Sequence, residues 1–156
     1  MKRLCSVLSA IVAGAMWFNG PALAASGAAF SPASAGDATF LIHHGNSIFN
    51  NDTANQHSAV AGGGAVTGGQ VLTFTVWVKG NGGTLVCALD ATNLATGVIA
   101  ANPSGQTTAV GFTTFSYTLD LTTFSGKNFS LSHWCIIPPS NANGPAEIIH
   151  VTSYGN

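Results

Sequence analysis

Positive charge is scarce in this chain. Four Lys and Arg residues stand against five Asp and Glu residues among 156. Two of the cations, Lys2 and Arg3, lie at the start of the chain, before a largely apolar stretch from Leu4 to Phe18. The other two, Lys79 and Lys127, are far apart in the sequence. They cannot form the clustered basic patch that nucleic acid or an anionic membrane requires, so both classes of partner are excluded.

The basic start and the apolar stretch lead into Ala22-Leu23-Ala24, a small-residue pattern of the kind that signal peptidases cleave. Residues 1–24 are therefore predicted to be a secretory signal peptide. Residues 25–156 are predicted to form a single exported domain, secreted or periplasmic and bacterial. Because the apolar run is too short to cross a bilayer, we expect no membrane span in the mature chain. The mature chain has a net charge of −3 and enough residues for one core.

Cysteine is also rare, with three residues, of which Cys5 lies in the predicted leader. Cys87 and Cys135 remain, and an even pair in an exported chain predicts a disulfide. Such a bond restricts the unfolded chain by ~4 kcal/mol in the chain-entropy description. Metal binding is the alternative, but neither cysteine belongs to a C-x-x-C pattern. We predict the disulfide, with no metal and no cofactor.

Long helical periodicity is absent, and apolar residues instead alternate with polar ones. The alternation runs from Val71 to Lys79 and resumes from Thr84 to Leu89, with a glycine-rich break between the two segments. A simple hairpin would bring Val76 opposite Cys87 and put both apolar sets on one face. In the same register, Trp77 would lie beside Val86 on the opposite face.

Similar alternation predicts further strands over residues 38–43, 107–112, 115–121, 129–135 and 147–153. Cys135 falls on the inward phase of its strand, as Cys87 does. His133 and His150 share the inward phase and are predicted to be core histidines. The expected fold is all-β, a single-domain antiparallel β-sandwich of the jelly-roll type.

The order of these elements resembles the jelly-roll carbohydrate-binding modules of the galactose-binding-like class. The resemblance rests on Thr73-Phe74-Thr75-Val76-Trp77-Val78-Lys79-Gly80, on Phe115-Ser116-Tyr117-Thr118-Leu119 and on Gly126-Lys127-Asn128-Phe129-Ser130-Leu131, within roughly residues 71–151. It implies a β-sandwich that binds a carbohydrate. Such modules commonly end with an acidic pair that helps to hold a structural calcium. This chain departs from that pattern, because it has Ile148-Ile149-His150-Val151 there.

Motifs of common enzyme classes are absent, including G-x-S-x-G, the phosphate-binding P-loop and H-E-x-x-H. A glycosidase would need two carboxylates beside the scissile bond, drawn here from Asp90, Asp120 and Glu147. The positions of Asp90 and Asp120, at a strand end and on a solvated phase, favour structural roles. We therefore predict no catalytic residue and no enzymatic activity.

Histidines offer a weak alternative as metal ligands. His43 and His44 are adjacent, so in a strand they point to opposite faces and cannot share a metal without distortion. Either could combine with His57 only if folding brings them together. Hydrogen-bonded or surface histidines are the simpler expectation.

Aromatic residues are the better ligand candidates. Trp77 and Trp134 fall on the phase opposite the predicted core, where an indole can stack against a sugar ring while polar neighbours such as Thr75 and Asp120 supply hydrogen bonds. Burial of either indole under a loop is the alternative. We predict an exported non-catalytic binding domain for a neutral glycan. The alternative is a structural or adhesive subunit of a cell envelope or extracellular matrix, which associates with another envelope protein through strand edges.

Overall fold

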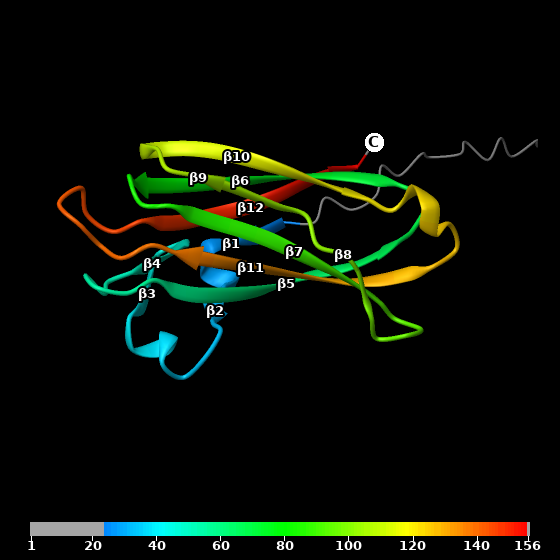
Figure 1. The fold of residues 1–156 in the computed structure, drawn as a ribbon, viewed down its shortest axis with the longest axis horizontal. Coiled ribbons are helices and arrows are strands. Elements are labelled where there is room, and N and C mark those ends of the chain that lie inside the picture. Colours follow the sequence, from blue (N-terminus) through cyan, green and yellow to red (C-terminus); the bar gives the residue numbers. More distant parts are fainter. Residues whose placement is uncertain (1–23, 156) are drawn as a thin grey trace, which may run out of the picture.

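The protein is a β-sandwich of two six-stranded sheets that pack face to face (Figure 1). The computed structural model describes residues 24–155, so the predicted signal peptide lies outside the described residues except for Ala24. No helix among these residues is long and apolar enough to cross a membrane. The strands are β1 (Ala24–Ser26), β2 (Ser31–Pro32), β3 (Leu41–His44), β4 (Ser47–Asn50), β5 (His57–Thr67), β6 (Val71–Asn81), β7 (Leu85–Asn93), β8 (Ile99–Ala101), β9 (Ser104–Thr107), β10 (Val110–Asp120), β11 (Asn128–Ile137) and β12 (Glu147–Gly155).

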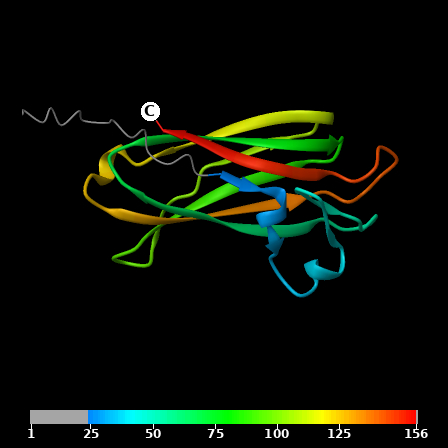
Figure 2. The same ribbon diagram turned by 180° about the vertical axis from the view of Figure 1, so that it is seen from behind.

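Both sheets are antiparallel, which confirms the predicted fold class. Sheet A has the strand order β10-β6-β12-β4-β3, and β1 also pairs with β12. Sheet B has the order β2-β5-β11-β7-β8, and β9 also pairs with β7. Short 3-10 helices lie at Gly27–Ala29 (η1), Asp37–Thr39 (η2) and Thr122–Phe124 (η3). Figure 2 shows η2 in a loop that projects beside β5 at one end of the sandwich.

The core fills the space between the sheets, and the alternation in the sequence determines which residues enter it. Phe74, Val76 and Val78 of β6 face inward and are wholly buried. Leu85 and Leu89 of β7 face inward from the other sheet and are equally buried. Burial of each large aliphatic or aromatic side chain contributes roughly 1.5 to 3 kcal/mol, so this layer is the main source of stability.

The predicted hairpin between these two segments is wrong. β6 pairs with β10 and β12 in sheet A, whereas β7 pairs with β11, β8 and β9 in sheet B. The glycine-rich link crosses from one sheet to the other, with Gly82 at φ 91°. Two strands that face one core from opposite sides have the same apolar alternation as two paired strands. The pattern therefore indicated which faces are buried but could not indicate the pairing, and Trp77 is not a neighbour of Val86.

The predicted disulfide is present. Cys87 on β7 and Cys135 on β11 lie directly opposite each other, with Sγ atoms 2.02 Å apart and Cα atoms 4.1 Å apart. The bond joins two neighbouring strands of sheet B at a wholly buried position. It therefore links segments 48 residues apart in the sequence.

His133 is a core histidine, as predicted. Its Nδ1 atom lies 3.1 Å from the Tyr117 hydroxyl, which reaches it from the opposite sheet, and its ring packs edge-on against Phe74. Gly63 makes room for this ring, because a Cβ at that position would lie 3.1 Å from it. Burial disfavours the charged ring and lowers the pKa of His133 to about 4.

Candidate functional site

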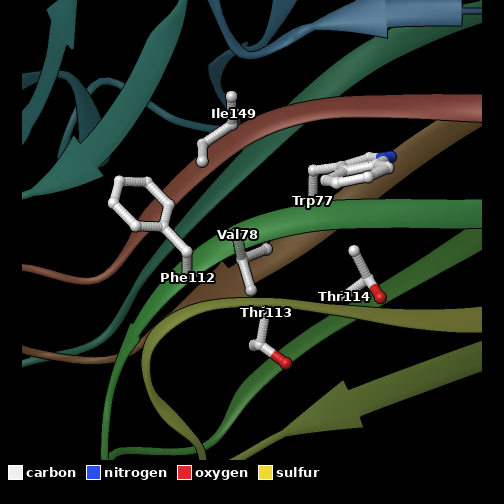
Figure 3. Close-up of a pocket in the computed structure, with 6 residues that line it drawn as sticks. All are labelled: Trp77, Val78, Phe112, Thr113, Thr114 and Ile149. Atoms are coloured by element: carbon white, nitrogen blue, oxygen red, sulfur yellow. The ribbon is translucent and has the colours of Figure 1, made fainter.

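The outer face of sheet A carries an exposed aromatic pocket. Trp77 on β6 is 45% exposed and Phe112 on β10 is 80% exposed. Together with Ile149 on β12 they line an open pocket of about 290 Å³, to which Val78, Thr113 and Thr114 also contribute. Figure 3 shows the three large side chains, each on one of three neighbouring strands, with Val78 between Phe112 and Trp77. Exposed apolar side chains that converge in this way are typical of a ligand contact surface.

A β-bulge in β12 shapes this pocket. Ile148 pairs with Val78 and His150 pairs with Trp77, so Ile149 is an extra residue between two successive pairs. After the extra residue, the alternation of inward and outward side chains in β12 is shifted by one position. His150 consequently lies on the outer face, where its ring stacks against the Trp77 indole with centroids 5.4 Å apart and planes at 21°. The prediction that His150 is a core histidine is therefore wrong.

Charges beside the pocket neutralise each other. Lys79 follows Trp77 by two residues on β6 and lies opposite Glu147 on β12. Its Nζ atom is 3.2 Å from Glu147 Oε1. Ser47 Oγ donates to the other carboxylate oxygen of Glu147 at 3.1 Å. Because Lys79 and Glu147 are paired with each other, neither presents an unpaired charge to a ligand in the neighbouring pocket.

A row of hydroxyl groups runs from the pocket along the outer face of sheet A. Thr114 is opposite Trp77 in the register of β10 and β6, and the next outward pair is Ser116 with Thr75. The hydroxyls of Thr75 and Ser116 lie 3.0 Å apart and hydrogen-bond. Each hydroxyl can donate one hydrogen bond and accept others, so this row retains capacity for an outside partner. The surface thus combines an apolar pocket with neutral hydrogen-bonding groups.

The four predicted ligand residues do not form one site. Thr75 and Trp77 share the outer face of sheet A, as their phase requires. Trp134 is half-buried on β11 of sheet B, on the opposite side of the sandwich. Asp120 is the last residue of β10, six residues beyond Thr114 and therefore about 20 Å along the strand. Its carboxylate accepts hydrogen bonds from the Thr122 backbone N–H and hydroxyl, which also lower its pKa.

Sequence reasoning missed Phe112 and Ile149 as pocket residues, and it missed His150 as the ring that stacks against Trp77. Phe112 could have been found, because it is an aromatic residue on a phase that continues with Thr114 and Ser116. Residues 110–120 form one strand, so that phase is continuous from Phe112 onward. Ile149 and His150 depend on the bulge, for which the sequence carries no clear signal.

Each carboxylate side chain already has partners within the fold. Glu147 binds Lys79 and Ser47, and Asp90 accepts a hydrogen bond from the Asn102 amide. Asp120 and Glu147 are opposite β6 positions eight residues apart, which separates them by about 27 Å. A glycosidase needs its two carboxyl groups within roughly 5 to 10 Å, so these two cannot form such a pair.

Histidines do not gather into a metal site within residues 24–155. His43 and His44 are exposed on β3. His57 on β5 is instead held between two aspartates, with Nδ1 3.0 Å from Asp37 Oδ1 and Nε2 3.0 Å from Asp52 Oδ2. Both ring nitrogens of His57 thus face a carboxylate oxygen.

Comparison with known proteins gives structural similarity only. No protein-family model matches the sequence, and no curated protein matches it. Among solved structures, the CBM22-2 xylan-binding domain from Paenibacillus barcinonensis Xyn10C is similar with a TM-score of 0.50 and 11% identity, over 85% of this chain and 98% of that one. The enzymatically active domain of tailspike protein 4 from bacteriophage CBA120 gives a TM-score of 0.53 and 8% identity, over 86% of this chain and 19% of that one.

A cyclase from Fischerella sp. TAU gives a TM-score of 0.50 and 13% identity, over 71% of this chain. This chain spans 64% of the length of that cyclase. At such identities the similarity concerns the fold alone. Because the xylan-binding domain is matched over nearly its whole length, the chain shares the jelly-roll β-sandwich fold of that domain.

Proposed function

We propose that this domain binds an uncharged carbohydrate on the outer face of sheet A and has no hydrolytic activity. The observation that carries the proposal is the open pocket lined by Trp77, Phe112 and Ile149. An exposed indole offers a flat apolar surface for the C–H face of a sugar ring. The hydroxyl of Thr114, which lines the pocket, and those of Thr75 and Ser116, which lie farther along the same face, can bond the rim of the ring.

The charge pattern supports an uncharged ligand. Lys79 beside the pocket is already paired with Glu147, so an acidic sugar would have to compete with an existing ion pair. The absence of a suitably spaced carboxylate pair at Asp120 and Glu147 supports binding without bond cleavage. The fold shared with the xylan-binding domain is compatible with both points.

Replacement of Trp77 by Ala tests the proposal. Binding of the purified mature domain to neutral and acidic polysaccharides is measured by calorimetry and affinity electrophoresis. Loss of a central aromatic contact typically costs at least about 2 kcal/mol, or roughly 30-fold in affinity. Because the indole lies on the outer face and is 45% exposed, we expect only a small change in melting temperature.

Trp134→Ala is the matched control, since it removes an indole from the outer face of the opposite sheet. This variant is expected to retain binding. Unchanged affinity of the Trp77 variant, or equal affinity of the domain for acidic polysaccharides, would contradict the proposed site. Turnover of a polysaccharide by the purified domain would contradict the non-catalytic assignment.

A structural or adhesive subunit is the second candidate. β10 is an end strand of sheet A and is eleven residues long, and Val110 on it is 63% exposed beside Phe112. Long end strands can pair with other chains. Concentration-dependent association in sedimentation experiments, reduced by Phe112→Ser and accompanied by no glycan binding, would favour this candidate.

A further inference from the structure

The strongest feature outside the pocket is the pairing of one histidine with two aspartates from separate segments. His57 begins β5, Asp37 begins η2 and Asp52 follows β4. The side chains of His57, Asp37 and Asp52 are 11%, 15% and 9% exposed. The Phe40 ring covers the imidazole, with centroids 4.7 Å apart and planes at 22°. The cluster therefore lies at a largely enclosed junction of three segments.

The geometry requires a specific protonation state. Both ring nitrogens of His57 lie 3.0 Å from a carboxylate oxygen. A neutral imidazole carries only one N–H, so it can donate to one aspartate while its other nitrogen presents a lone pair to the second. With both aspartates ionised, only the doubly protonated ring satisfies both contacts. The arrangement is thus complete when His57 is charged and both aspartates are ionised.

The electrostatic environment favours that charged state. Burial opposes the charge on His57, but the hydrogen bonds that the ring donates to Asp52 and Asp37 outweigh it and raise the pKa of the histidine. The pKa of Asp37 is lowered despite burial, through hydrogen bonds from Ser34, Ser58 and His57. The pKa of Asp52 is lowered by the Ala54 backbone N–H, His57 and Asn55. Both aspartates therefore stay ionised in the range where the histidine titrates.

We propose that Asp37, His57 and Asp52 form a pH-controlled latch, which tightens the contact of the η2 loop (residues 33–40) with β5 while the imidazole is doubly protonated and loosens it when the ring becomes neutral. The latch is independent of the carbohydrate pocket. The change is local, because both ends of the loop keep backbone hydrogen bonds: the Ala33 N–H donates to the Ser58 carbonyl at 2.8 Å, and the Phe40 carbonyl accepts from the Asn51 N–H at 2.9 Å.

Asp52 belongs to a segment that has its own hydrogen bonds to the rest of the fold. The Asn50 amide donates to the backbone carbonyls of Asn55, Ile137 and Pro138 at 2.8 to 3.1 Å. Asp52 also accepts hydrogen bonds from Ala54 and Asn55 within its own loop. The neutral ring can therefore keep Asp52 as a partner, and the η2 loop then loses its contact with the ring. Asp37 Oδ1 still accepts a hydrogen bond from the Ser58 backbone N–H at 3.0 Å, so the loop is loosened rather than detached.

Other titratable groups near the latch are limited. β3 lies next to η2 and carries His43 and His44, whose side chains are exposed. Within residues 24–155 no lysine forms an ion pair with Asp37 or Asp52, and Lys79 pairs with Glu147. A variant that lacks both His43 and His44 is therefore the control for the latch.

Carbon-detected NMR of the mature domain between pH 5 and pH 9 tests the latch. The methyl group of Ala38 reports on the η2 loop, that of Ala54 reports on the anchored loop, and His57 Cε1–H reports on the ring. We expect Ala38 to change with the same midpoint as His57, above the value of ~6.5 for an ordinary histidine. Ala54 is expected to change much less.

His57→Gln should abolish the Ala38 transition, because glutamine does not titrate in this range. The double variant His43→Gln/His44→Gln should retain it. Where His57→Gln fails to fold, Asp37→Asn takes its place, and it should lower the His57 midpoint and remove the coupling to Ala38. A His57 midpoint at or below ~6.5, or an Ala38 transition that survives in His57→Gln or Asp37→Asn, would overturn the latch.

Discussion

Acidification from pH 8 to pH 5 should weaken the fold through His133, and the size of the effect follows from its burial. The ring is 2% exposed, faces the Tyr117 hydroxyl and Phe74, and has a pKa lowered to about 4. An unfolded histidine has a pKa of ~6.5. Above pH ~6.5 neither state holds the proton, and the contribution of the neutral ring to stability is complete.

As pH falls below ~6.5 the unfolded chain binds a proton that the folded protein does not, so stability decreases until the pH reaches the folded value of about 4. The difference of about 2.5 pKa units corresponds to about 3 kcal/mol in total, of which about 2 kcal/mol is lost at pH 5. For a domain of this size, that loss lowers the melting temperature by about 7 °C.

Urea denaturation of the wild type and of His133→Gln at pH 8, 6.5 and 5 measures this contribution. Glutamine can still hydrogen-bond the Tyr117 hydroxyl but does not titrate. The variant is expected to be less stable than the wild type at pH 8, and the difference in the free energy of unfolding should shrink by about 2 kcal/mol at pH 5. The comparison between the two proteins removes the opposing contribution of His57, which is common to both. A difference that stays constant from pH 8 to pH 5 would refute the argument.

Two further predictions concern stability. Reduction of the bond between Cys87 and Cys135, or Cys87→Ala with Cys135→Ala, should lower the free energy of unfolding by up to ~4 kcal/mol, because the bond closes a long loop. Free thiols in the native protein, seen by non-reducing mass spectrometry, would contradict the pairing. Gly27→Ala should destabilise the protein strongly, since the added Cβ would lie 2.1 Å from the Ile148 carbonyl oxygen. Gly36→Ala is the matched control, because its nearest neighbour would be 3.6 Å away, and equal melting temperatures of the two variants would contradict the steric reasoning.

The disulfide and the buried faces were predictable from local sequence. Only two cysteines follow the predicted leader, so a single intramolecular pairing was possible. The alternation around Phe74 and around Leu131 fixed which side of each strand is buried, since successive side chains point to opposite faces. The same rule placed Trp77 and Thr75 together on an outer face.

Tertiary structure alone decided the strand partners and the contents of the pocket. β6 and β7 have matching apolar phases whether they pair or face each other across a core, so the alternation could not distinguish the two arrangements. The bulge at Ile149 shifts the phase of β12 by one residue, which brings His150 out to Trp77. The contacts of His57 with Asp37 and Asp52 likewise depend on how separate segments meet. Local alternation determines the orientation of a side chain, whereas long-range packing determines which side chains come together.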